Sequence, residues 1–398
     1  MLNIKLSHIS AGFIAVLVGY TSSVAIILQA ANALNANQDQ LNSWMLVLGC
    51  GMGLTSIILS SAYKMPVITA WSTPGAALLA TSLMGVSMEQ AVAGFILTGL
   101  LILACGLTGW FAMIQRFIPN SIANAMLAGI LFQVCSATFQ ALQQEFSLVL
   151  LMLLSYLFAK PVLKNYTIAI VFLIGILFSW QQGLFIDQPI ELALAKPVWI
   201  SPDFTLSAFI SISIPLFIVT MTSQNVPGIA TLQAAGYNPP VSPSLIVTGL
   251  TTALLGAMGG FSYNLAAITA AICCTEEVDS NKNTRYIAGI ATGIFYLIIG
   301  LFGATVVSLF LVAPKALLIT IAGLALLNTL ANSLNAALSA EQDREAALLT
   351  LLITVSGVSF FSIGSPFWGL LLGMIFLHVR KRQAKAALNT SEIAKNKF

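Results

Sequence analysis

The residues around position 73 are of the types that bind an anion, although the chain around them is apolar. The segment reads Thr69-Ala-Trp-Ser-Thr-Pro-Gly-Ala-Ala77. Ser72 or Thr73 can cap a helix that begins here, because Pro74 suits the first helical position. Gly75 and Ala76 would then leave backbone N–H groups uncovered. Such a helix start offers hydrogen-bond donors and about half a positive charge, so we expect it to bind an anionic substrate.

A second segment resembles the first at a spacing of 190 residues, with Trp71-Ser-Thr-Pro-Gly-Ala-Ala aligned on Phe261-Ser-Tyr-Asn-Leu-Ala-Ala. Asn264 takes the place of Pro74 in this alignment. We therefore expect Ser262, Tyr263 and Asn264 to form a second helix start that faces the first. The alternative for both segments is a kinked helix that packs through small residues, as is common in membranes.

A third polar cluster ends a long apolar run, and it reads Thr220-Met-Thr-Ser-Gln-Asn-Val-Pro-Gly228. Gln224 and Asn225 are unfavourable in lipid unless they are paired, and Pro227 frees a backbone carbonyl. We expect both amides to hydrogen-bond a substrate in a central cavity, with Tyr20 and Ser23 as their counterparts in the first half. The alternative is a polar helix end at the cytoplasmic boundary.

Four aromatic residues near these segments could stack on a flat ring, namely Tyr20, Trp71, Phe261 and Tyr263. Ordinary packing is the alternative for each of them. The apolar segments lack a clearly embedded Asp, Glu, Lys or Arg, such as proton pumps usually keep. Nucleotide-loop, metal-cluster and catalytic Ser/His/Asp patterns are absent as well. We therefore expect neither an enzyme nor a cofactor, metal or nucleic-acid partner.

Composition places these segments in a membrane protein. The chain has 398 residues, of which 58% are hydrophobic and 7% are charged, whereas soluble domains have about 25% charged residues. Short stretches with charged residues, or with Pro and Gly, separate twelve apolar spans, and lipid is the solvent that such spans require. The spans lie near residues 9–31, 43–62, 91–113, 119–138, 147–159, 166–182, 204–222, 243–257, 284–311, 316–337, 346–361 and 364–379.

Two further apolar pieces, 74–84 and 264–274, are too short to cross. At 1.5 Å per residue, about 11 residues reach roughly 16 Å, against a hydrocarbon core of about 30 Å. Extended-looking residues precede each piece, 67–70 in one case and 258–261 in the other. We therefore expect two half-helices, each preceded by a short strand, and fourteen transmembrane elements in an all-α polytopic fold.

The chain also carries an internal repeat. Ile96, Thr98, Gly99, Leu103, Gly106, Leu107 and Gly109 recur 194 residues later as Ile290, Thr292, Gly293, Leu297, Gly300, Leu301 and Gly303. Duplicated hydrophobic chains are typical of transporters whose site lies where the repeats meet. We assign residues 1–200 to the first repeat and 201–380 to the second, with a polar, basic and frayed tail at 381–398.

The distribution of basic residues indicates orientation. With a cytoplasmic N-terminus, fourteen of the sixteen Lys and Arg residues fall inside, and only Lys196 and Lys315 fall outside. This division agrees with the positive-inside rule. Seven elements per repeat turn the second copy over, so the repeats are inverted. We expect a multi-pass protein of the cytoplasmic membrane with both termini in the cytoplasm.

Several motifs resemble the benzoate/proton symporter (BenE) family over nearly the whole chain. They are Gly12-Phe-Ile-Ala-Val-Leu-Val-Gly-Tyr-Thr-Ser-Ser-Val-Ala, Thr69-Ala-Trp-Ser-Thr-Pro-Gly-Ala-Ala-Leu-Leu, Thr222-Ser-Gln-Asn-Val-Pro-Gly-Ile-Ala, Ala235-Gly-Tyr-Asn-Pro-Pro-Val-Ser-Pro, Ala266-Ala-Ile-Thr-Ala-Ala-Ile-Cys and Gly364-Ser-Pro-Phe-Trp-Gly. The resemblance implies the fold of nucleobase and sulfate-type transporters. In that fold a core domain (elements 1–4 and 8–11) moves against a gate domain (elements 5–7 and 12–14).

The resemblance also implies import of benzoate or a related aromatic carboxylate, coupled to protons. Nucleobase carriers of this fold place glutamates near Gln224 or Asn225 and at the second half-helix, where this chain offers amides and hydroxyls. The replacement of glutamates by amides and hydroxyls fits an anionic substrate, but it removes the side chain that would most obviously carry a proton. A carrier or channel for another small organic or inorganic anion is the alternative function. Lipid surrounds the protein, and a homodimer is one option for its assembly.

Overall fold

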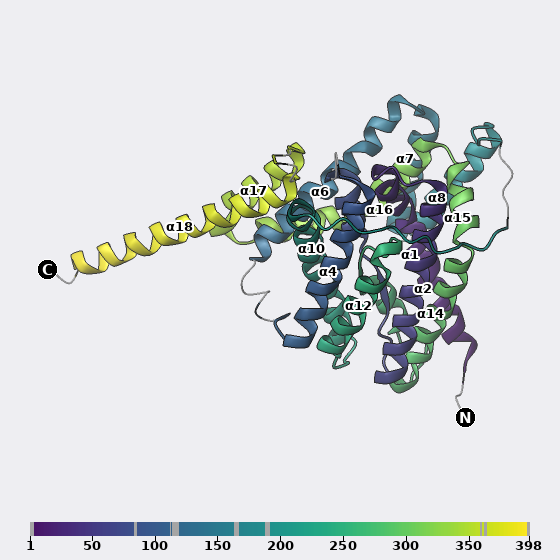
Figure 1. The fold of residues 1–398 in the computed structure, drawn as a ribbon, viewed down its shortest axis with the longest axis horizontal. Coiled ribbons are helices and arrows are strands. Elements are labelled where there is room, and N and C mark those ends of the chain that lie inside the picture. Colours follow the sequence, from purple (N-terminus) through teal and green to yellow (C-terminus); the bar gives the residue numbers. More distant parts are fainter. Residues whose placement is uncertain are drawn as a thin grey trace.

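The computed structural model describes residues 4–82, 86–111, 113, 119–162, 167–187, 192–358, 360–361 and 364–395, and it is mostly helical (Figure 1). The first half contains α1 (Leu6–Ala33), α2 (Gln38–Tyr63), β1 (Thr69–Trp71), α3 (Thr73–Ser82), α4 (Met88–Thr108), α6 (Asn120–Gln140), η1 (Ala141–Gln143), α7 (Phe146–Val162) and α8 (Thr167–Gln181). The second half contains α9 (Leu206–Ala208), η2 (Phe209–Ser213), α10 (Ile214–Thr220), η3 (Met221–Asn225), α11 (Val226–Ala234), α12 (Val241–Leu255), η4 (Gly256–Met258), β2 (Tyr263–Leu265), α13 (Ala267–Cys273), η5 (Lys282–Thr284), α14 (Tyr286–Leu301), α15 (Gly303–Leu311), α16 (Lys315–Leu338), η6 (Glu341–Asp343), α17 (Arg344–Ser356) and α18 (Ser365–Lys395).

Seven helices of the described residues are long and apolar enough to cross a membrane, or eight if the bent α1 counts as one span. Helices suit lipid because they satisfy their backbone hydrogen bonds internally. The count of fourteen elements stays a prediction. The tail differs from expectation, because α18 continues as a helix to Lys395 and projects away from the body in Figure 1. Residues 396–398 of the predicted tail lie outside the described residues.

Repeated glycines allow the longest helix contacts. α2 packs along α14, and α4 packs along α12. A methyl group added to Gly49 would lie 2.5 Å from the Cα atom of Gly300, and one added to Gly99 would lie 2.8 Å from the Cα atom of Ala253. Both distances are shorter than any real contact of a Cβ atom. These glycines therefore bring helix backbones together, which is how small residues stabilise helix pairs in lipid.

The two strands pair across a local two-fold axis and correct the register of the predicted repeat. β1 and β2 are antiparallel, with Ala70 opposite Asn264 at the centre of the register. Flanking bonds obey the same symmetry: the Ser72 N–H donates to the Ser262 carbonyl, and the Ala266 N–H donates to the Ile68 carbonyl. The spacing of 194 residues therefore holds here too, and the alignment at 190 was wrong. The position of the second strand also differs from the prediction. We expected it at residues 258–261, but β2 begins at Tyr263.

The helical run from Leu206 to Ala234 contains two π turns, η2 and η3. Pro227 lacks the N–H that would bind the carbonyl of Ser223 four residues earlier, and such gaps favour a wider turn. The helix continues past the polar cluster, so Gln224 lies within a span rather than at its end. Wide turns of this kind often occur at functional sites because they change the direction of a few side chains.

A buried ionic cluster fixes the start of α1 to the segment after α13. Asp279 accepts from the Lys5 ammonium at 2.8 Å and contacts the His8 ring at 3.1 Å. The Asn281 N–H and the Thr284 hydroxyl also donate to it. These donors, the Lys5 ammonium above all, hold the pKa of the Asp279 carboxyl well below its usual range. The place of His8 in the chain is therefore explained by its contact with Asp279, without a role in transport chemistry.

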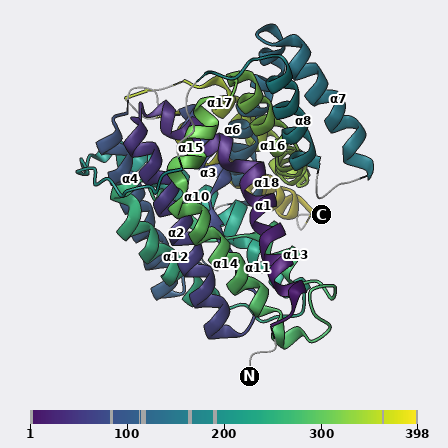
Figure 2. The same ribbon diagram turned by 90° about the vertical axis from the view of Figure 1, so that its right-hand side faces the viewer.

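The helices form two packed groups. In the first group, α6 packs on α16 and α17, α17 packs on α18, and α7 packs on α8. The other group contains the α2–α14 and α4–α12 pairs, and Figure 2 shows α7 and α8 well away from α2, α12 and α14. α1 joins the groups, because it contacts α3, α13 and α14 on one side and α16 on the other. This division matters because the cavity described next lies between the groups.

Candidate functional site

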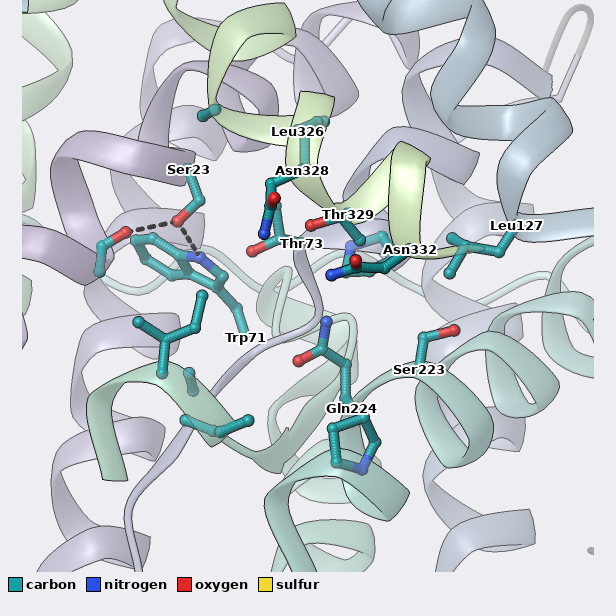
Figure 3. A pocket seen from close by; sticks show the side chains of 18 of the residues that line it. Ser23, Trp71, Thr73, Leu127, Ser223, Gln224, Leu326, Asn328, Thr329 and Asn332 are labelled. Carbon is teal, nitrogen blue, oxygen red and sulfur yellow. Dashed lines mark hydrogen bonds between the residues drawn. The ribbon is translucent and has the colours of Figure 1, made fainter. Parts of the chain in front are cut away.

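A cavity of about 480 Å³ lies where α1, the starts of α3 and α13, the π turn η3, α6 and α16 meet. That volume is within the range of small-molecule sites in proteins. Figure 3 shows Thr73, Gln224, Asn328, Thr329 and Asn332 around it. The lining of the cavity, as far as the chain is described, contains no Asp, Glu, Lys, Arg or His. It combines hydroxyls, amides and small apolar groups.

The start of α3 presents Thr73 to the cavity but keeps its other predicted donors occupied. The Ser72 hydroxyl accepts from the Gly75 N–H at 3.1 Å, and the Ser72 carbonyl accepts from the Ala76 N–H at 2.8 Å. The expectation that Gly75 and Ala76 leave free N–H groups was therefore wrong, because Ser72 caps the helix. Among the described residues, Thr73 finds no partner for its hydroxyl, and this hydroxyl lies at the cavity.

The start of α13 lies three residues beyond the predicted position. Ala266, Ala267, Ile268 and Thr269 line the cavity there. No side chain caps this helix, and the Thr269 hydroxyl is buried beside Tyr296, its side-chain hydrogen-bond neighbour at the cavity. Thr269 is a cavity residue that the sequence analysis missed, because the repeat was aligned four residues off.

The three residues predicted at the second start do not line the cavity. Asn264 lies fully buried at the centre of β2, opposite Ala70. The Tyr263 hydroxyl donates to the Val47 carbonyl at 2.6 Å, away from the cavity. The Ser262 hydroxyl bonds to that of Thr220 at 2.9 Å. Their place in or directly before β2, rather than in α13, explains why they support the site from behind.

The two predicted amide side chains, Gln224 and Asn225, lie in different surroundings. Gln224 lines the cavity together with its neighbours Thr222 and Ser223. Asn225 is fully buried, and its side-chain oxygen accepts from the Leu265 N–H at 3.0 Å. One amide therefore faces the cavity, and the other fixes β2 to η3. This difference follows from the helical turn, which points adjacent side chains in directions about 100° apart.

Trp71 forms one wall of the cavity and is held there from behind. Its indole N–H donates to the Ser23 hydroxyl at 2.8 Å, and Ser23 in turn donates to the Gly19 carbonyl at 2.6 Å (Figure 3). Tyr20 packs edge-on against the indole, with ring centroids 4.7 Å apart. Ser23 and Trp71 line the cavity, whereas Tyr20 lies behind them. Phe261 is fully buried against Trp44 and Phe95.

A polar face of α16 completes the lining, and we did not predict it. Asn328, Thr329, Asn332 and Ser333 lie there between Ala325 and Ala336. Their spacing of three to four residues places them on one side of a helix. This spacing was visible in the span 316–337 and could have been noticed, because polar side chains in a membrane span usually face an aqueous space.

Solved structures define the class of protein to which this fold belongs. The transmembrane domain of a cyanobacterium bicarbonate transporter, BicA, is 14% identical, with 92% of this chain and 97% of that chain covered and a TM-score of 0.62. The murine Solute Carrier 26 family member A9 anion transporter, in its inward-facing state, is 13% identical, with 95% and 68% covered and a TM-score of 0.66. The fold is that of an inverted-repeat membrane transporter.

The family follows from the sequence itself. Residues 2–379 match the family described as benzoate membrane transport protein, BenE. The inner membrane protein YdcO of Escherichia coli strain K12 is 45% identical over 363 residues, which cover 91% of this chain and 93% of that protein. The benzoate membrane transport protein of Acinetobacter baylyi is 38% identical over 371 residues, with 93% and 94% covered. The chain belongs to the BenE family. It is a multi-pass membrane transporter and not an enzyme, and the resemblance found in the sequence is confirmed.

Proposed function

We propose that this chain imports benzoate or a related aromatic carboxylate, together with protons, by alternating access. Membership of the family carries the proposal, and the relative from Acinetobacter baylyi bears the name of a benzoate transporter. The cavity supports it as well, because a flat indole and several hydroxyl and amide donors line it, and no acidic side chain does so within the described part of the chain. A carboxylate placed there would meet donors and no repelling charge.

The carboxylate is bound between Thr73 and Thr269. Both residues line the cavity, and each belongs to the first turn of a helix. Within the described chain the Thr73 hydroxyl is bound to no protein group, whereas that of Thr269 is buried beside Tyr296. Hydroxyl donors bind an anion strongly where water is partly excluded. The ring then lies against Trp71, whose orientation the Ser23 hydroxyl fixes. Ser72, Ser262, Asn264 and Asn225 hold the two starts in place from behind.

The proton enters with the substrate. The described lining of the cavity holds no carboxylate or imidazole that could carry a proton. Benzoate that binds as the anion, takes up a proton from water in the cavity and then crosses as benzoic acid needs no titrating side chain. Uptake should therefore respond to the proton gradient although the cavity is uncharged.

Alternating access uses the two packed groups as domains. The core comprises the predicted elements 1–4, which are α1 to α4, and 8–11, which are α9 to α15. The gate comprises the predicted elements 5–7, which are α6 to α8, and 12–14, which are α16 to α18. The Gln29 amide of α1 reaches the Leu318 carbonyl of α16 at 3.5 Å, on the side away from Asn124 and Ala336 of the cavity. We infer that this contact closes the outer side and that the cavity opens inward. Assembly as a homodimer stays a prediction.

Both termini lie in the cytoplasm in this proposal, and the connection 187–203 lies outside. Single cysteines at Leu192 and at Glu341, in a background without the five native cysteines, test this orientation. Both positions are exposed. We expect an impermeant thiol reagent to label the first and not the second in intact cells, and to label both after lysis. The reverse pattern in intact cells would mean that the topology is inverted.

A carrier for another small anion is the second candidate, because the two structural neighbours are a bicarbonate and an anion transporter. Uptake of labelled benzoate into proteoliposomes, with and without an inward proton gradient, distinguishes the candidates. We expect benzoate uptake to rise with the gradient. Unlabelled benzoate should compete, whereas acetate buries little apolar area and benzamide lacks the charge, so both should compete poorly. Saturable uptake of labelled bicarbonate with none of labelled benzoate would favour the second candidate.

A further inference from the structure

Two amide side chains face each other across the cavity. Gln224 comes from η3, and Asn332 comes from α16 (Figure 3). Both line the cavity, and within the described chain neither has a hydrogen-bond partner. We call Gln224 and Asn332 the amide pair. Each member offers an N–H donor and a carbonyl acceptor, so together they can bind a group that both donates and accepts.

The amide pair lies apart from the carboxylate donor of the proposed function. In Figure 3, Thr73 lies above the space between Trp71 and the amide pair. A ring in that space, with its carboxylate on Thr73, has its opposite edge toward Gln224 and one side toward Asn332 (Figure 3). Unsubstituted benzoate offers neither a donor nor an acceptor at that edge. The amides would then keep waters or lose hydrogen bonds when benzoate binds.

A hydroxyl group at that edge matches the amide pair. It donates one hydrogen bond and accepts another, so one amide can contribute its oxygen and the other its N–H group. We propose that Gln224 and Asn332 bind a ring hydroxyl, and that the substrate class is a hydroxylated aromatic carboxylate such as 3- or 4-hydroxybenzoate. This inference rests on the proposed function and makes its substrate more specific. Because α16 and η3 belong to different packed groups, such a substrate contacts both.

Competition against labelled benzoate in proteoliposomes tests the inference. For the wild-type protein we expect 3- or 4-hydroxybenzoate to compete about tenfold better than benzoate, the ratio that one added net hydrogen bond supports. 2-Hydroxybenzoate should show no gain, because its hydroxyl bonds to its own carboxylate. 4-Methoxybenzoate lacks the donor and should show none either.

Variants assign the gain to the amide pair. Asn332→Leu and Gln224→Met keep the side-chain size and remove the polar atoms. We expect each to reduce the ratio between benzoate and hydroxybenzoate to about one. Asn335→Leu is the matched control, because Asn335 lies on the same helix and is exposed but does not line the cavity. This control should keep the wild-type ratio.

The outcomes separate this inference from the proposed function. If no aromatic acid competes, the proposed function itself is wrong. If benzoate competes and the hydroxybenzoates are no better, the amide pair binds water and this inference alone is wrong. An unchanged ratio in Asn332→Leu and Gln224→Met would likewise overturn it, because the hydroxyl would then bind elsewhere.

Discussion

Uptake should stop completely when α1 is joined to α16 near the ends that the proposal places outside. Cysteines at Gln29 and Leu318 replace two residues that meet across these helices, where the Gln29 amide lies 3.5 Å from the Leu318 carbonyl, and an assay of free thiols after treatment with an oxidant establishes that they link. If the core must move against the gate to open the outer side, the disulfide holds the protein inward-facing. We expect benzoate uptake into proteoliposomes to be lost on oxidation and restored by a reductant, while binding in detergent persists.

A matched pair within the gate controls for the chemistry of oxidation. The Gln133 amide of α6 donates to the Val355 carbonyl of α17 at 2.9 Å, so this pair repeats the same kind of contact between helices of one group. Cysteines at Gln133 and Val355 should cross-link without loss of uptake. Full uptake by the oxidised Gln29–Leu318 pair would show that α1 and α16 do not separate during transport, and alternating access by this motion would be wrong.

The sequence predicted the class of fold well because it depends on coarse features. Apolar spans, short pieces near positions 74 and 264, and recurring glycines such as Gly99 and Gly293 each reflect a strong constraint of the membrane. The start of the first half-helix at Thr73 was found from Pro74, whose fixed backbone angle restricts the alternatives. These features depend on neighbours in the sequence, so one chain suffices to recognise them.

The details of the site depend on pairing between distant segments, and the predictions from sequence were wrong about this pairing. Phe261-Ser-Tyr-Asn resembles Trp71-Ser-Thr-Pro, but the register of β1 against β2 places Asn264 opposite Ala70 and begins α13 at Ala267. Whether Gly75 keeps a free N–H depended on the rotamer of Ser72. The polar spacing on α16 was visible in the sequence, but only the structure shows that this face lies opposite the start of α3 at the cavity.

Removal of the Thr73 hydroxyl should weaken benzoate binding by about 1–3 kcal/mol, which is roughly 5- to 150-fold in the dissociation constant. Thr73→Val preserves the shape of the side chain and the start of α3, because Ser72 still caps the helix. The lost group is a donor to a partly desolvated carboxylate, and such charge-assisted bonds are stronger than neutral ones. Calorimetric titration of purified protein in detergent measures the change.

Thr81→Val is the control for this substitution, since it removes a hydroxyl from the other end of the same helix, where Thr81 bonds the Ala77 carbonyl. Its dissociation constant should stay within about twofold of wild type. Thr269→Val should also weaken binding, because Thr269 lines the same cavity beside Tyr296. Asn264→Leu should instead lower thermal stability, since that residue supports the strands. Unchanged affinity in both Thr73→Val and Thr269→Val would place the carboxylate elsewhere.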